Sequence, residues 1–97
     1  MSGAATSTVQ IDNDRVKVTE WRFAPGAETG FHIHEMDYTI VPIISGRLKL
    51  VDPDGKENTA ELTAGTSYFR EAGVHHNVIN DSEFEIAFVE IELKQDS

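Results

Sequence analysis

The sequence contains no cysteine. This absence excludes a disulfide framework, thiolate ligands for zinc or iron–sulfur clusters, and a cysteine nucleophile. A metal site in this chain must therefore be built from histidine, carboxylate or backbone oxygen. With 97 residues, the chain has enough length for one hydrophobic core and none to spare for a second.

Long apolar runs are also absent. The longest uninterrupted one, residues 40–44, is far shorter than a membrane-spanning helix requires. The first fourteen residues are polar and lack the basic and apolar parts of a secretory signal. We therefore expect a cytoplasmic protein with no membrane partner.

Basic side chains are scarce. Eight Lys and Arg residues stand against seventeen Asp and Glu, which gives a formal net charge of −9. Nucleic acid is not an expected partner, because such a chain would repel a phosphate backbone. An anionic small-molecule ligand would need local positive charge, for which Arg22, Arg47 and Arg70 are the candidates.

The helical pattern of apolar residues at three-and-four spacing is missing as well. Short β-type segments recur instead, and we expect strands at residues 16–24, 31–34, 38–45, 47–51, 59–62, 66–69, 75–79 and 84–93. The sequence Asp52-Pro53-Asp54-Gly55 predicts a hairpin turn. The pattern indicates an all-β sandwich or barrel, formed by residues 15–94 as one domain after a loosely attached segment of residues 1–14.

The four histidines are unevenly distributed. His32 and His34 lie in one expected strand, and His75 and His76 lie in another. Side chains alternate along a strand, so His32 and His34 emerge on one face and can bind a common metal ion. One more histidine from a neighbouring strand would complete a set of three imidazoles with open positions for water or substrate.

The same alternation leaves a second interpretation open. Phe31 and Ile33 share the opposite face of this strand, and burying them would leave both histidines in solvent. Pattern alone does not decide between a metal site and two exposed histidines.

A wider frame of spacings surrounds the histidines. The first part, G-x5-H-x-H-x4-T-x6-G, is formed by Gly26, His32, His34, Thr39 and Gly46. The second part, G-x5-E-x-G-x2-H-x3-N, is formed by Gly65, Glu71, Gly73, His76 and Asn80. The two parts resemble the signature motifs of the cupin superfamily, G-x5-H-x-H-x(3,4)-E-x6-G and G-x5-P-x-G-x2-H-x3-N. The resemblance implies a cupin jelly-roll β-barrel.

The resemblance also implies roles for individual residues. His32, His34 and His76 take the positions of metal ligands, and the ion would be divalent: iron, zinc, nickel, manganese or copper. His75, one residue out of phase, is expected to face away from the site. Asn80 is expected to fix the end of its strand rather than to contact a ligand.

The sequence departs from the cupin pattern in its acidic ligand. The usual glutamate is missing, its position falls on Thr39, and Tyr38 stands just before it. Thr39 could orient a bound water and Tyr38 could reach over the site, so these two are the catalytic candidates. The proline of the second motif is replaced by Glu71.

A closer likeness is carried by residues 18–26, by Asp37-Tyr38 ahead of Val41-Pro42, and by residues 88–93. These runs resemble a group of small bacterial monocupins, some of them associated with β-alanine breakdown. That group also lacks the glutamate.

The resemblance favours a small metal-binding cupin that acts as an enzyme on a small polar metabolite, by dioxygenase-like or isomerase-like chemistry at a three-histidine centre. The alternative is a non-catalytic cupin that binds or senses a small molecule. We also expect a homodimer, because inward histidines would leave Phe31 and Ile33 facing outward and in need of cover.

Overall fold

The structure is a computed structural model that describes residues 3–94. These residues contain no helix, and therefore none that could cross a membrane. The chain runs through nine strands: β1 (Thr6–Asp12), β2 (Val16–Phe23), β3 (Glu28–Ile33), β4 (Asp37–Pro42), β5 (Gly46–Val51), β6 (Glu57–Leu62), β7 (Tyr68–Arg70), β8 (His75–Asn80) and β9 (Ile86–Leu93).

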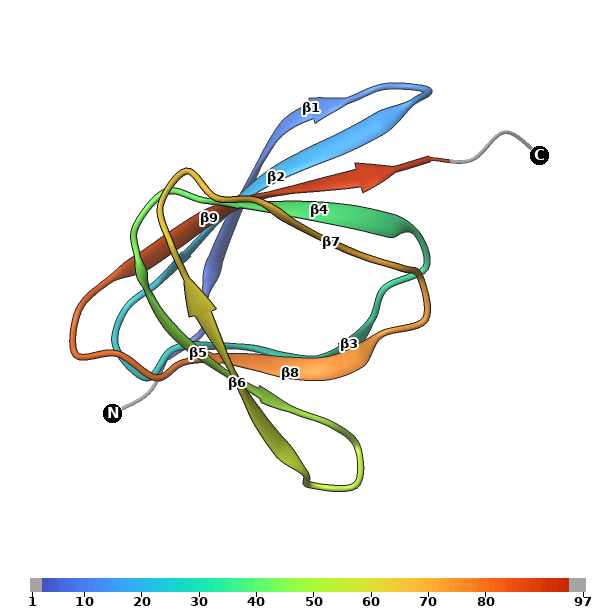
Figure 1. Ribbon diagram of the computed structural model, residues 1–97. Coiled ribbons are helices and arrows are strands. Elements are labelled where there is room, and N and C mark those ends of the chain that lie inside the picture. Colours follow the sequence, from blue (N-terminus) through green and yellow to red (C-terminus); the bar gives the residue numbers. More distant parts are fainter. Residues whose placement is uncertain (1–2, 95–97) are drawn as a thin grey trace.

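The strands form two antiparallel sheets that face each other (Figure 1). One sheet has the order β1-β2-β9-β4-β7, and the other has the order β3-β8-β5-β6. Most neighbours within a sheet are distant in sequence, so the chain crosses repeatedly between the layers. The expected all-β jelly roll is confirmed, and each expected strand has an observed counterpart.

The hydrophobic core lies between the two sheets. Its members include Phe23, Ile40, Leu48, Ile86 and Phe88, all at most 5% exposed. They lie inside because side chains alternate along each strand, as in β4, where buried and half-buried positions succeed one another. Each such side chain contributes on the order of 1.5–3 kcal/mol relative to an exposed position.

The strand β1 was not expected from the sequence. It pairs with β2 from Thr6 opposite Arg22 to Asp12 opposite Lys17, within the segment expected to be loosely attached. This corrects the expectation that ordered structure begins only after residue 14. All seven side chains of β1 are exposed, so the strand adds nothing to the core, and its sequence offers only the short alternation of residues 9–12 as a β-type pattern.

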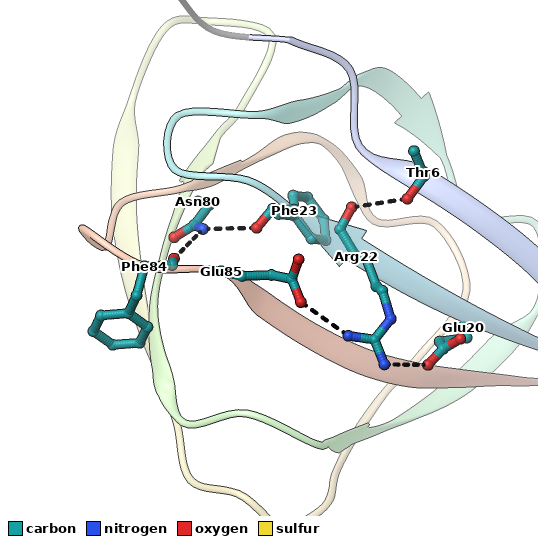
Figure 2. Close-up of polar contacts among 7 residues, drawn as sticks. All are labelled: Thr6, Glu20, Arg22, Phe23, Asn80, Phe84 and Glu85. Carbon is teal, nitrogen blue, oxygen red and sulfur yellow. Dashed lines mark hydrogen bonds and ion pairs between the residues drawn. The ribbon is translucent and has the colours of Figure 1, made fainter.

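A buried amide closes one end of the sheets. Asn80, at the end of β8, is 2% exposed, and its side-chain amide donates to the carbonyl oxygens of Phe23, Ala24 and Phe84. Its side-chain oxygen accepts from the backbone N–H of Ser82. Figure 2 shows the amide reaching both Phe23 and Phe84. The expectation that Asn80 fixes a strand end agrees with these contacts.

At two positions the local structure requires glycine. Gly55 has a φ of 87° and closes the hairpin between β5 and β6, where its N–H donates to the Asp52 carbonyl. Gly46 begins β5 against the core, where a Cβ atom would lie 2.7 Å from Ile86 Cδ1. The hairpin turn expected at residues 52–55 is therefore confirmed.

Candidate metal centre

Three histidines meet on the inner face of the four-stranded sheet. Strands β3 and β8 pair so that His32 lies opposite His76, and His34 follows immediately after β3. The His32 and His34 Nε2 atoms are 2.9 Å apart, and the His34 and His76 Nε2 atoms are 3.2 Å apart. The three expected ligand residues are therefore brought together.

These distances suit a shared divalent ion. Two imidazole nitrogens bound at about 2.1 Å to one ion lie roughly 3.0–3.4 Å apart in octahedral or tetrahedral geometry. His32, His34 and His76 each offer one nitrogen, and the three atoms lie within 4.8 Å of one another. The cluster is compatible with a metal ion bound by three neutral imidazoles.

The backbone before His32 sets the direction of its ring. His32 Nδ1 lies 3.0 Å from the Gly30 carbonyl oxygen, which can only accept, so Nδ1 donates to it and Nε2 is the nitrogen available to a metal ion in the neutral imidazole. The register of β3 shifts between Glu28 and Phe31, and Gly30 there adopts a φ of 84°. The Gly30 N–H is bound in turn by the Asn77 side-chain oxygen of β8.

Two of the three histidines are held in their neutral, metal-binding form. Burial, together with the neighbouring His32 and His76, lowers the pKa of His34 to about 3. Burial also lowers the pKa of His76 to about 4, with His32, His75 and Arg70 contributing. Both imidazoles therefore stay unprotonated well below neutral pH, as a metal ligand must.

The outward face of the same strands carries the remaining histidine. His75 is exposed, and its ring packs edge-on against Phe31 with 6.1 Å between the ring centroids. Phe31 and Ile33 are 55% and 59% exposed. The alternative in which these two side chains are buried and the histidines are left in solvent is therefore wrong.

Tyr38, not Thr39, occupies the inward position of β4. Tyr38 is buried, and its ring stacks on His34 with 4.0 Å between centroids and 20° between the planes. Alternation along β4 turns Thr39 to the opposite side, and it does not line the cavity at the histidines. The expectation that Thr39 lies at the site is corrected. The cupin motif allows three or four residues between the second histidine and the acidic position, and in this chain the spacing of three, which leads to Tyr38, reaches the inward position.

The histidines and Tyr38 line a cavity of about 290 Å³ between the sheets. Much of the remaining wall is apolar and comes from both layers: Ile40, Leu48, Leu50, Val78 and Phe88. Burial raises the pKa of Tyr38 to about 12, so its phenol keeps its proton near neutral pH. The cavity thus offers a hydroxyl donor beside three imidazole nitrogens.

Only one of the three candidate arginines lines this cavity. Arg70 does so, and its guanidinium carbon lies 4.7 Å from the centre of the Tyr68 ring. Arg22 is exposed and pairs with Glu20 and Glu85 at 2.9 Å each, as Figure 2 shows. Arg47 is also exposed, on β5.

Two acidic residues of the site were missed at the sequence level. Glu90 and Glu92 of β9 both line the cavity, and Glu90 Oε2 lies 3.9 Å from His34 Nδ1. Burial, together with the nearby Glu92, raises the pKa of Glu90 to about 7. A signal was present, because Glu90 continues the buried alternation of Ile86 and Phe88 along β9.

The class of protein is defined by an antiparallel two-sheet jelly roll whose interior holds three convergent imidazoles compatible with a metal ion. The family described as the cupin domain matches residues 19–92. The chain therefore belongs to the cupin family.

Individual relatives are similar along almost the whole chain. The β-alanine degradation protein BauB of Pseudomonas aeruginosa is 58% identical over 96 residues, covering 97% of this chain and all of that protein. The crystal structure of a cupin domain from Bordetella pertussis is also 58% identical, with a TM-score of 0.93 and 98% of each chain covered. The polyketide cyclase RemF of Streptomyces resistomycificus is 25% identical, with a TM-score of 0.73, 94% of this chain and 66% of that chain covered.

Proposed function

We propose that this cupin is a metal-dependent enzyme that acts on a small polar metabolite within β-alanine degradation or a related breakdown sequence. The observation that carries the proposal is the convergence of the His32, His34 and His76 Nε2 atoms at the wall of the internal cavity. The 58% identity to a protein named for β-alanine degradation supports the metabolic context.

The three histidines would hold one divalent ion. When bound, that ion would supply a Lewis-acidic or oxygen-binding centre suited to isomerase-like or dioxygenase-like chemistry. The protein fixes the imidazoles in advance through the Gly30 carbonyl bond to His32 and the stacking of Tyr38 on His34.

The other cavity residues bind and orient the metabolite. Tyr38 donates a hydrogen bond from its phenol, since the raised pKa keeps the proton on the oxygen at neutral pH. Arg70 attracts a carboxylate at the cavity wall. Apolar side chains such as Leu48 and Phe88 exclude bulk water and strengthen these polar contacts.

Elemental analysis of untagged protein tests the first step. We expect close to one divalent ion per chain, lost from a His32→Ala/His34→Ala variant and kept by His75→Ala. Chelation should lower the thermal midpoint of the unmutated protein but not that of the double variant. Absence of metal under every growth condition would overturn the proposal.

Turnover tests the second step. Metal-loaded protein is incubated with small β-oxo and β-amino acids while oxygen uptake and product formation are followed. We expect product with the unmutated protein and none with His76→Ala. Ligand-dependent stabilisation without product, at saturating ligand and with metal bound, would assign the protein to the class of binding or sensing cupins instead.

A further inference from the structure

Glu90 is a buried carboxylate without a hydrogen bond. It is 9% exposed and lines the cavity, yet no donor among the described residues bonds to its carboxylate within hydrogen-bonding geometry. Its Oε2 atom lies 3.9 Å from His34 Nδ1, which is beyond hydrogen-bonding distance. Buried charged groups are normally paired, so this carboxylate has room for a partner that the protein does not supply.

A second carboxylate stands beside it. Glu92 lies two residues further along β9, on the same side of the strand, and also lines the cavity. One oxygen of Glu90, one oxygen of Glu92 and a His34 nitrogen all lie within 4.8 Å of one another. The two acids therefore present oxygens to a single point in the cavity.

The cations around the two acids do not neutralise them directly. Lys17 lies opposite Glu92 on β2 and slightly lowers the pKa of Glu90, but neither acid forms an ion pair with a lysine or arginine in the part of the chain that the structure describes. Arg70 lies on the far side of Tyr38, since Glu92 and Arg70 both pair with Tyr38 from opposite sides. Neighbouring strands are about 4.8 Å apart, so the Glu92 and Arg70 backbones are separated by roughly 10 Å.

An unsatisfied donor lies on the same wall. The indole Nε1 of Trp21 is buried and has no hydrogen-bond partner within residues 3–94. Trp21 lines the cavity and lies close enough to Glu90 to oppose the rise of its pKa, although the two do not meet hydrogen-bonding geometry. A single indole N–H could fill only one of the acceptor positions of the Glu90 carboxylate, and no other donor among the described residues fills the rest.

We propose that Glu90 and Glu92 bind the protonated amine of a small amino-acid-like ligand whose carboxylate lies toward Arg70 and the histidine cluster. An ammonium group supplies three donors to the two acids, and the aromatic face of Trp21 adds favourable contact with a cation. Arg70 lies on the same sheet two strands away from the acids, beyond Tyr38, where it can attract the carboxylate. This inference deepens the proposed function, because it names the class of substrate for the same cavity.

Two other uses of the acidic pair lead to different results. If the pair and His34 held a second metal ion, the protein would bind two ions per chain. If Glu90 served only to orient His34 or to accept from Trp21, cavity ligands would show no preference for an amine. Ligand titrations and metal counting distinguish both of these uses from amine binding.

The fluorescence of Trp21 reports on this cavity directly, because the chain has one tryptophan. Metal-loaded protein at pH 8 is titrated with β-alanine, propylammonium chloride and sodium propanoate at constant ionic strength. We expect β-alanine to saturate the signal and propanoate to bind roughly tenfold or more weakly, since propanoate lacks the ammonium group. Equal binding of propanoate and β-alanine would overturn the inference.

Isosteric variants locate the amine. Glu90→Gln and Glu92→Gln should each weaken β-alanine and propylammonium binding by about tenfold while leaving propanoate binding no weaker. Glu83→Gln, which removes an exposed carboxylate from the loop between β8 and β9, is the matched control and should change nothing. Unchanged amine binding in both cavity variants, or a second equivalent of metal that Glu92→Gln abolishes, would reject the assignment.

Metal-free protein separates this inference from the proposed function. Amine-selective quenching that persists in His76→Ala supports the acidic subsite even if no turnover is ever found. Turnover without amine preference would retain the metal-dependent enzyme and reject the amine subsite.

Discussion

Asn80 and Glu90 are both buried polar side chains, at 2% and 9% exposure, but they lie in two different settings of the same fold. Asn80 makes four side-chain hydrogen bonds to backbone groups at the closed end of the sheets. Glu90 lines the cavity without one in the described chain. Burial of a polar group thus stabilises the fold where its partners are complete, and indicates a ligand where they are not.

The two settings also differ in where their partners come from. The atoms around Asn80 are backbone groups of β2, the turn after it and the loop before β9, which every sequence of this fold supplies. The groups around Glu90 are side chains, namely those of Trp21, His34 and Glu92. A buried polar group whose partners are backbone atoms constrains the fold. A buried polar group surrounded by side chains can be adapted to a chemical role by substitution of those side chains.

The largest expected effect is at the closed end. Asn80→Ala would leave three carbonyls and one N–H without their partner, and we expect the free energy of unfolding to fall by about 3–5 kcal/mol. Urea denaturation measures this. Asn58→Ala, which removes an exposed amide from β6, should cost less than about 0.5 kcal/mol. A similar small loss of stability in both variants would show that the hydrogen bonds of Asn80 do not stabilise the fold.

The next effect is on metal affinity at the cavity end. His76→Ala should weaken metal binding by at least about a hundredfold, because one of three ligands is lost, whereas His75→Ala should leave it unchanged. Competition with a chelator measures both affinities. Equal losses would mean that β8 is shifted in register by one residue.

The pH dependence of stability in metal-free protein sharpens the comparison further. Unfolding lets His34 and His76 take up protons that the folded state resists, so stability falls as the pH drops from 6.5 towards 4. Glu90 acts in the opposite sense: its raised pKa means that stability falls as the pH rises from 4.5 to 7. Glu90→Gln should therefore be more stable than the unmutated protein at pH 8, by on the order of 1–3 kcal/mol.

Thermal unfolding across pH 4 to 9 checks this prediction. The Glu90→Gln variant should also lose stability more steeply on the acid side, because the opposing titration is gone. Parallel pH profiles for the two proteins would show that the pKa of Glu90 is not raised, and that its carboxylate, like the Asn80 amide, has the partners it needs in the folded protein.

The smallest effect on the fold is expected on the outer face of β3. We propose that a second copy of the chain covers Phe31 and Ile33, since β3 is an edge strand and both side chains are more than half exposed. Light scattering should show a dimer that Phe31→Glu/Ile33→Lys shifts towards monomer with little change in metal content. A monomer in the unmutated protein would reject this.

The sequence predicted the strands that alternate and the histidines that share a face. His32 and His34 were placed on one face by period-two alternation, which is a local property of the chain, whereas the choice of His76 came from the resemblance to the second cupin motif. β1 was missed because its alternation of apolar and polar residues is short, and the glutamate position was assigned to Thr39 rather than to Tyr38 because a turn of variable length precedes β4. Arg70 could not be chosen among the arginines, since only the pairing of β4 with β7 brings it to the cavity.

The pairing of β3 with β8 has a consequence for the order of events during folding. His34 and His76 are 42 positions apart, and no local segment contains all three imidazoles. Two ligands are available as soon as β3 exists, but the third arrives only when β8 docks beside it, which is a slow, long-range step. Tight metal binding should therefore develop at the same rate as the pairing of β3 with β8, so the rate of metal binding during refolding reports the rate of this last step.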